Sequence, residues 1–128
     1  MRLVSDPASG EVDLTASAEE LALLANAVAE GDGFIGSTSS AAAGALAGIE
    51  SRNSSRSGVR IEVDAARHVL VIRGDPGGRE VLADNLRAMA AAEDGGHLHV
   101  DYFPEHPYLR EGSASIVVNS PHGGMPTR

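Results

Sequence analysis

The same succession of patterns occurs twice in this chain: two short segments with strand-like alternation, then one amphipathic helical segment. In the first copy, RLVS and EVDLT lie on either side of turn residues and precede a helical repeat of apolar positions over residues 18–30. Ser17 and Glu20 form a capping-box signature before this repeat, and Gly31 follows it. The pattern predicts a hairpin followed by a helix.

The second copy begins at Val59. VRIEV and HVLVIR predict two strands, and Asp75 and Pro76 then supply an N-cap and a first helical residue. The helical repeat continues through Val81, Leu82, Leu86 and Met89 until Asp94-Gly95-Gly96. After each helix the similarity continues, since AEGDGFI (29–35) resembles AEDGGHL (92–98) and LAGIES (46–51) matches SASIVV (113–118). The chain therefore predicts two degenerate β-β-α-β-β halves.

This repeat predicts an α+β fold in which a mostly antiparallel sheet carries both helices on one face. At 128 residues the chain is expected to form a single domain with one core. We divide it into a first half (1–35), a second half (59–121), a tail (122–128) and the Ser- and Gly-rich residues 36–58 between the halves. That last segment is predicted to be a flexible connector or to contain an edge strand at 46–51, and a short helix at 41–46 is the alternative.

Charge and composition exclude several classes of protein. Acidic residues outnumber arginines 18 to 10, lysine is absent, and the net charge of −8 argues against a nucleic-acid partner. No cysteine is present, which excludes disulfides, thiolate metal sites and cysteine nucleophiles. No apolar stretch approaches the length of a membrane span, so we expect no membrane association and a cytoplasmic location.

The stretch GGHLHVDYFPEHPYL (95–109) concentrates the ionisable and aromatic residues of the second half. Strand alternation places His97, His99, Asp101 and Phe103 on one face and Leu98, Val100 and Tyr102 on the face toward the helices. Two histidines and an aspartate at this spacing are an alternative metal site, whereas the plain interpretation is a half-exposed sheet face.

FPEHPYL contains Pro104 and Pro107, which predict the end of the strand and a stiff projecting loop. Exposed aromatic residues on such a loop lose little entropy on docking, so they are candidate anchors for another protein. The alternative is that Phe103 and Tyr108 fold back onto the core. A second motif, GDPGGRE (74–80), has the form of a Gly-rich turn before a helix; with Arg79 it is an alternative anion site, but it lacks the P-loop lysine.

VRIEVDAARHVLVIRGD, GGREVLADNLRAMA, GGHLHVDYFPEHPYL and SIVVNSP together resemble the immunity protein 32 family, which is found beside bacterial polymorphic-toxin genes. The resemblance covers about residues 59–121. It implies a protein that binds and neutralises a cognate toxin, without catalysis and without a cofactor.

An acidic and aromatic surface would suit that function by complementing a basic toxin. Glu11, Asp13, Glu62 and Asp101 are candidates for an acidic, helix-free sheet face. The predicted partner-binding residues are His97, His99, Asp101, Tyr102, Phe103, Glu105, His106 and Tyr108. The alternatives are a small metal-dependent enzyme using His97, His99 and Asp101, or a self-associating interaction domain; we expect a monomer or weak dimer.

Overall fold

The computed structural model describes residues 1–6, 11–37, 45–91 and 97–119. The first β-β-α-β-β half contains β1 (Arg2–Ser5), β2 (Val12–Thr15), α1 (Ala18–Glu30), β3 (Gly33–Gly36) and β4 (Gly48–Asn53), so it extends beyond residue 35 into the segment that the sequence placed between the halves. The second half contains β5 (Val59–Asp64), β6 (Val69–Gly74), α2 (Pro76–Ala91), β7 (His97–Val100) and β8 (Ile116–Asn119). Both predicted β-β-α-β-β halves and the α+β class are therefore confirmed.

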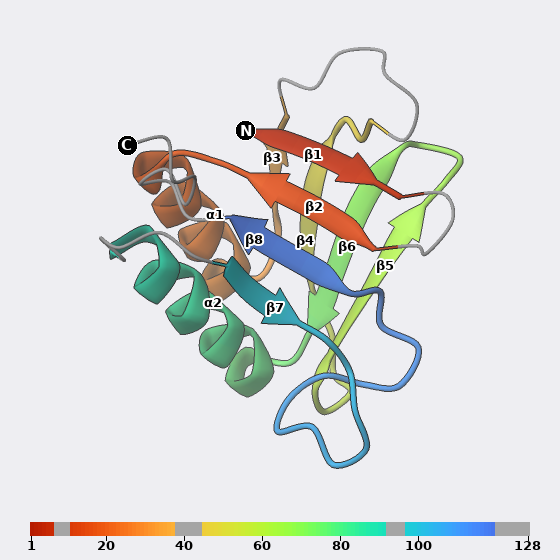
Figure 1. The fold of residues 1–128 in the computed structure, drawn as a ribbon. Helices are drawn as coiled ribbons and strands as arrows, with labels where there is room; N and C mark the ends of the chain where they lie inside the picture. The colour runs from red at the N-terminus through yellow and green to blue at the C-terminus, as the bar shows by residue number, and fades with distance from the viewer. Residues whose placement is uncertain (7–10, 38–44, 92–96, 120–128) are drawn as a thin grey trace.

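The strands form two four-stranded sheets, where the sequence predicted one. The first has the order β1-β2-β8-β7 and the second, which we call sheet B, has the order β3-β4-β6-β5. Within each sheet the two outer pairings are antiparallel, and the central pairing is parallel, β2 with β8 and β4 with β6. Figure 1 shows the first sheet in front of sheet B, with both helices along one side.

The division into two sheets follows from the way the two halves combine. Each half contributes its first hairpin to one sheet and its last hairpin to the other, so replacing every element by its repeat partner exchanges the two sheets. A hairpin alone cannot bury its apolar face, and the exchange lets each one pack against elements of the other half. Alternation along a strand does not reveal which distant strand will pair with it, which explains why the sequence predicted a single sheet.

Apolar residues from both sheets and both helices form one core. Leu3 and Leu14 from the first sheet, Ile61 and Leu70 from sheet B, and Leu24 from α1 all belong to it and are buried. On α2, Leu82 and Leu86 are buried as predicted, whereas Val81 is 43% exposed. Helices α1 and α2 pack directly against each other. Neither helix in the described part of the chain has the length and apolar character of a membrane span.

Both predicted helix starts have the expected caps. At α1, the backbone N–H of Glu20 donates to Ser17 Oγ (3.1 Å), and the Ser17 N–H donates to Glu20 Oε1 (2.9 Å). The amino group of Met1 also donates to Glu20 Oε2, and this bond lowers the pKa of the Glu20 carboxyl. At α2, Gly78 N–H donates to Asp75 Oδ1 at 2.9 Å. The predicted end of α2 at Asp94-Gly95-Gly96 lies outside the described residues.

Strand β4 lies inside sheet B, between β3 and β6, whereas the sequence predicted at most an edge strand for this segment. The small residues of β4 lack the bulky apolar side chains that indicate an interior strand in a sequence. Gly48 lies against Ile35 and the Phe34 ring, and the buried Ser51 donates from Oγ to the carbonyl of Gly31 (2.8 Å). Most of the alternative helix at 41–46 falls outside the described residues.

Candidate functional site

A long segment, residues 101–115, joins β7 to β8 and runs along the outer edge of β5 (Figure 1). We call this segment the connector; it is distinct from residues 36–58. Val59 N–H donates to the carbonyl of Tyr108 and Arg110 N–H donates to the carbonyl of Val59, both at 2.7 Å. Further along, Ala114 N–H donates to the carbonyl of Ile61. These bonds satisfy backbone groups that an edge strand would otherwise leave open, and they fix the part of the connector that follows the projecting turn.

The projecting part is a tight turn from Phe103 to His106. His106 N–H donates to the carbonyl of Phe103 at 3.0 Å, with Pro104 at the second position of the turn. Glu105, at the third position, has φ +69°, a backbone region that favours glycine. Holding a side chain there costs about 1 kcal/mol or more. A glycine at position 105 would relieve this strain, so the glutamate carboxylate at this position is not explained by the stability of the turn.

His106 stabilises the turn through two hydrogen bonds and two ring contacts. Its Nδ1 accepts hydrogen bonds from Tyr108 N–H (3.2 Å) and Leu109 N–H (3.0 Å). Its ring also lies between those of Phe103 (centroids 4.6 Å apart) and Tyr108 (4.7 Å). Because Nδ1 accepts two bonds, it carries no proton in this arrangement. Burial lowers the pKa of His106, in agreement with a neutral ring.

Acid should loosen this turn. The pKa of His106 is lowered from 6.5 in the folded protein, so the unfolded state binds more protons and stability increases with pH in this range. The contribution is complete above the unfolded pKa and is lost as pH falls through the folded pKa. Below pH 6.5 we expect lower protection factors at the Tyr108 and Leu109 amides, that is, exchange faster relative to the intrinsic rate at the same pH. In His106→Asn, whose amide does not titrate in this range, that change in protection with pH should disappear.

The structure separates the predicted residues into an exposed group and a supporting group. His99, Asp101, Phe103 and Glu105 are exposed. Val100 is buried and Tyr102 packs against the core, as alternation beyond the end of β7 predicts. Tyr108 is buried as well. Tyr108 also accepts at its hydroxyl from Asn85 Nδ2 (3.2 Å), and burial raises its pKa. The alternative in which Tyr108 folds back onto the core is therefore correct, whereas Phe103 projects.

The alternative metal site is not assembled among the described side chains, where no three His, Asp or Glu residues are placed to hold an ion. His97 starts β7, but its side chain lies outside the described part of the structure. A site that combines His97 with His99 and Asp101 therefore stays a prediction.

The predicted acidic face is not formed as one surface. Asp13 lies on β2, in the first sheet, where Oδ1 accepts from Asn119 Nδ2. Glu62 lies on β5, in sheet B, where it pairs with Arg60 and Arg73. The two carboxylates belong to different sheets because the hairpins of the two halves are exchanged. Glu11 and Asp101 are exposed outside the strands.

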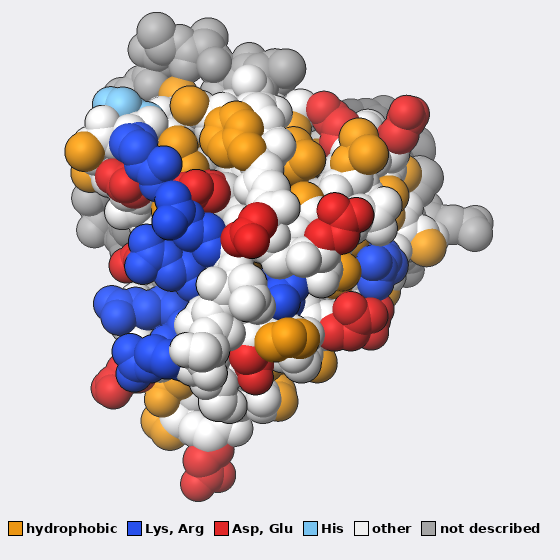
Figure 2. Space-filling model, turned by 180° about the vertical axis from the view of Figure 1, so that it is seen from behind, with side chains coloured by type: hydrophobic (Ala, Val, Ile, Leu, Met, Phe, Trp, Pro, Cys, Tyr) orange, Lys and Arg blue, Asp and Glu red, His pale blue; other side chains and the backbone are white. Residues whose placement is uncertain are grey.

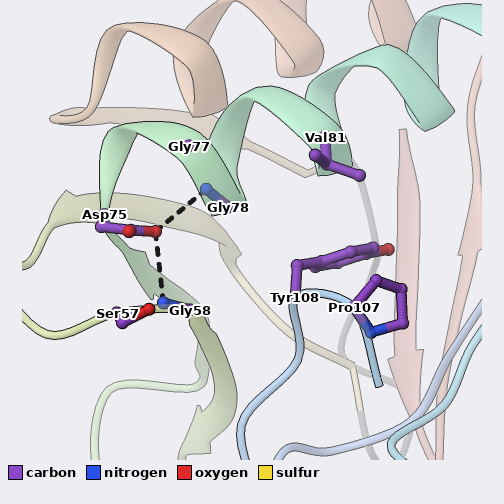
Figure 3. A pocket seen from close by; sticks show the side chains of 8 residues that line it. All are labelled: Ser57, Gly58, Asp75, Gly77, Gly78, Val81, Pro107 and Tyr108. Atoms are coloured by element: carbon purple, nitrogen blue, oxygen red, sulfur yellow. Dashed lines mark hydrogen bonds between the residues drawn. The ribbon is translucent and has the colours of Figure 1, made fainter. Parts of the chain in front are cut away.

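A shallow pocket of about 240 Å³ lies between the start of α2 and the connector. Figure 3 shows Val81 of α2 facing Tyr108 and Pro107 across it, with Asp75 at the other end. Asp75 Oδ1 accepts from the N–H groups of Gly58 (3.2 Å) and Gly78 (2.9 Å). A carboxylate thus occupies the helix N-terminus that the anion hypothesis for GDPGGRE required.

Arg79 is also unavailable to an anion, because it is only 3% exposed and its donors have protein partners. Nε donates to the carbonyl of Gly74 (2.8 Å), and Nη1 donates to the carbonyls of Val28 (2.9 Å) and Ala29 (2.8 Å). Nη2 donates to Asn53 Oδ1 (2.7 Å). Arg79 therefore caps the C-terminus of α1 from the second half of the chain, where the helix dipole favours a cation.

The connector lies within a segment that matches a known protein family. The family described as Immunity protein 32 matches residues 69–121, from the first residue of β6 to just past β8. The resemblance to the immunity protein 32 family is confirmed. The immunity protein 32 match covers less than half of the chain and includes α2, β7 and the whole connector. No curated protein and no solved structure matches the chain.

Sequence reasoning missed one feature of this region, a group of arginines beside the connector. Arg110 belongs to the connector, and Arg60 and Arg73 lie on the neighbouring strands β5 and β6. In the sequence each arginine looks like an isolated exposed residue of its own segment. Only the pairing of the strands shows that the arginines are neighbours.

Proposed function

We propose that this protein is an immunity protein that binds and neutralises a cognate polymorphic toxin, and that the connector makes the contact. The match to immunity protein 32 carries this proposal, because it spans the connector and the two strands that the connector joins, β7 and β8. The family likeness also favours a binding protein over an enzyme. The proposed contact residues are His97, His99, Asp101, Phe103 and Glu105. Of the other predicted residues, His106 contacts the rings of Phe103 and Tyr108, and Tyr102 and Tyr108 pack against the core.

Three physical features of the connector favour binding. Phe103 is 52% exposed at the tip of a turn that contains a proline, so it presents an apolar ring at a small entropic cost. The His106 ring supports it from within the chain. The strained backbone at Glu105 holds a carboxylate at the same tip, and strain of this kind is often kept for function.

Co-expression with the toxin encoded beside this gene tests the proposal. The full chain should restore growth, and Phe103→Ala should weaken binding of the purified toxin about 30-fold or more, as expected for an interface anchor. Phe34→Ala is a matched control, since Phe34 is 56% exposed but lies on β3. Calorimetric titration of both variants, with melting curves as a check of folding, gives the comparison.

Two results would count against different parts of this proposal. If the neighbouring gene product is not toxic, or if the chain fails to protect, the protein is not its immunity partner. If the chain protects and Phe103→Ala binds as tightly as Phe34→Ala, immunity stands and the connector is not the contact surface.

A further inference from the structure

Three arginines lie side by side across the outer face of sheet B. The strand register pairs Arg52 of β4 with Arg73 of β6, and Arg73 with Arg60 of β5. Their side chains are all 45–48% exposed and lie on the same face of the sheet. Like charges directly opposite each other on neighbouring strands are destabilising, so this row opposes folding.

Two glutamates in the neighbouring row balance the arginines only in part. Glu62 lies 3.9 Å from Arg60 and 3.5 Å from Arg73, so one carboxylate serves two guanidinium groups at long range. Glu50 lies 2.8 Å from Arg52 but also 2.7 Å from Arg67, which lies outside the row. The two Glu62 pairs are exposed on both sides and contribute little to stability. The row therefore keeps a positive excess.

Arg56 and Arg110 extend the positive charge beyond the end of these strands. The Nε of Arg110 is buried, and among the described residues it has no hydrogen-bond partner. Burial and the nearby charges of Arg56 and Arg60 lower the pKa of Arg110, although Asp75 acts in the opposite direction. A buried donor without a partner is destabilising, so an anionic acceptor at this point would remove a penalty.

We use the name arginine face for Arg52, Arg56, Arg60, Arg73 and Arg110. Figure 2 shows blue side chains gathered on this side of the molecule, with red ones distributed around them. Such a concentration is unexpected in a chain with a net charge of −8. It suits a partner that carries local negative charge and reaches the face at short range.

We propose that the arginine face docks a carboxylate-rich segment of a partner protein. Guanidinium groups on neighbouring strands match carboxylates well, because each can donate two parallel hydrogen bonds. A nucleic acid fits less well, because its continuous row of phosphates needs an extended basic surface, whereas Glu50, Glu62 and Asp75 lie within or beside this one and limit its extent. The proposal does not depend on the immunity function or on the connector contact.

Fluorescence anisotropy of a labelled polyglutamate peptide, titrated with the full chain at low salt, tests this docking. The peptide should bind in spite of the net negative charge of the protein. The double variant Arg60→Gln/Arg73→Gln should weaken binding about tenfold or more. Arg87→Gln removes an equally exposed arginine from α2 and should leave the affinity unchanged. Phe103→Ala should also leave it unchanged, which separates this surface from the toxin contact.

A second measurement distinguishes docking from a structural role. Because the row is repulsive, Arg73→Gln should keep or raise the melting temperature while it weakens peptide binding. Absence of peptide binding, or equal weakening by Arg87→Gln, would overturn the proposal. A labelled oligothymidylate that binds more tightly than the peptide, and loses affinity in the double variant, would overturn the assignment to a protein partner.

Discussion

Arg79→Met should lower the free energy of unfolding by about 3 kcal/mol or more. Methionine keeps most of the length of the side chain but has no donors, so the carbonyls of Gly74 and Val28 would lose buried hydrogen bonds. The carbonyl of Ala29 and the amide oxygen of Asn53 would lose theirs as well. The Gly74 carbonyl would keep the bond that it accepts from the Ser54 N–H (2.8 Å), so the loss falls mainly on the other acceptors. An acceptor left without any partner costs about 1–3 kcal/mol when it is fully buried, and urea unfolding would measure the total.

Two comparison variants show which property of Arg79 matters. Arg87→Met makes the same change on the same helix, where the side chain is 40% exposed and pairs with Asp84 at 3.0 Å, and it should cost no more than about 0.5 kcal/mol. Arg79→Lys keeps the charge but not the planar fork, so we expect an intermediate loss. Equal stabilities of Arg79→Met and Arg87→Met would refute the capping role.

The second large effect is expected at Gly48. A Cβ atom there would lie 2.5 Å from the carbonyl oxygen of Ile35 and 2.6 Å from the Phe34 ring, so Gly48→Val should force β3 away from β4. Overpacking of this kind costs about 1–3 kcal/mol, and we expect the upper part of that range because a backbone atom must move. Thermal and urea unfolding would both detect the loss.

Gly36 provides a close control because it is the register partner of Gly48 on β3. Among the residues that the structure describes, a Cβ atom on Gly36 would approach the Phe34 ring alone, at 3.8 Å, which is ordinary contact. Gly36→Val should therefore be neutral or slightly stabilising, since valine favours strands. If Gly36→Val destabilises the protein as much as Gly48→Val does, the loss comes from this strand pair in general and not from the close approach at Gly48.

Local patterns in the sequence predicted local structure well. The capping box at Ser17 and Glu20 and the N-cap at Asp75 mark helix starts through bonds within a few residues, and both starts are confirmed. Alternation along HLHVDYF similarly predicted that Val100 is buried and His99 exposed. These features depend on neighbours in the chain, which the sequence displays directly.

Features that depend on distant pairing were not predicted. The interior position of β4 follows from its contacts with β3 and β6, and the residues over which it was expected include only two bulky apolar groups, Leu46 and Ile49. The same applies to the arginine row, whose members are separated by up to 21 residues and meet only through the register of three strands. Arg79 was weighed as an anion ligand because its partners on α1 lie about 50 residues earlier.

The exchange of hairpins also determines when each part of the protein is able to fold as it leaves the ribosome. All four strands of sheet B lie between Gly33 and Gly74, so this sheet has its complete set of strands before β7 and β8 are synthesised. The parallel pairing of β2 with β8 must wait until Asn119 has emerged. The nascent hairpin β1–β2 would remain without its pairing partner until then, and early exposure of such an edge is where aggregation begins.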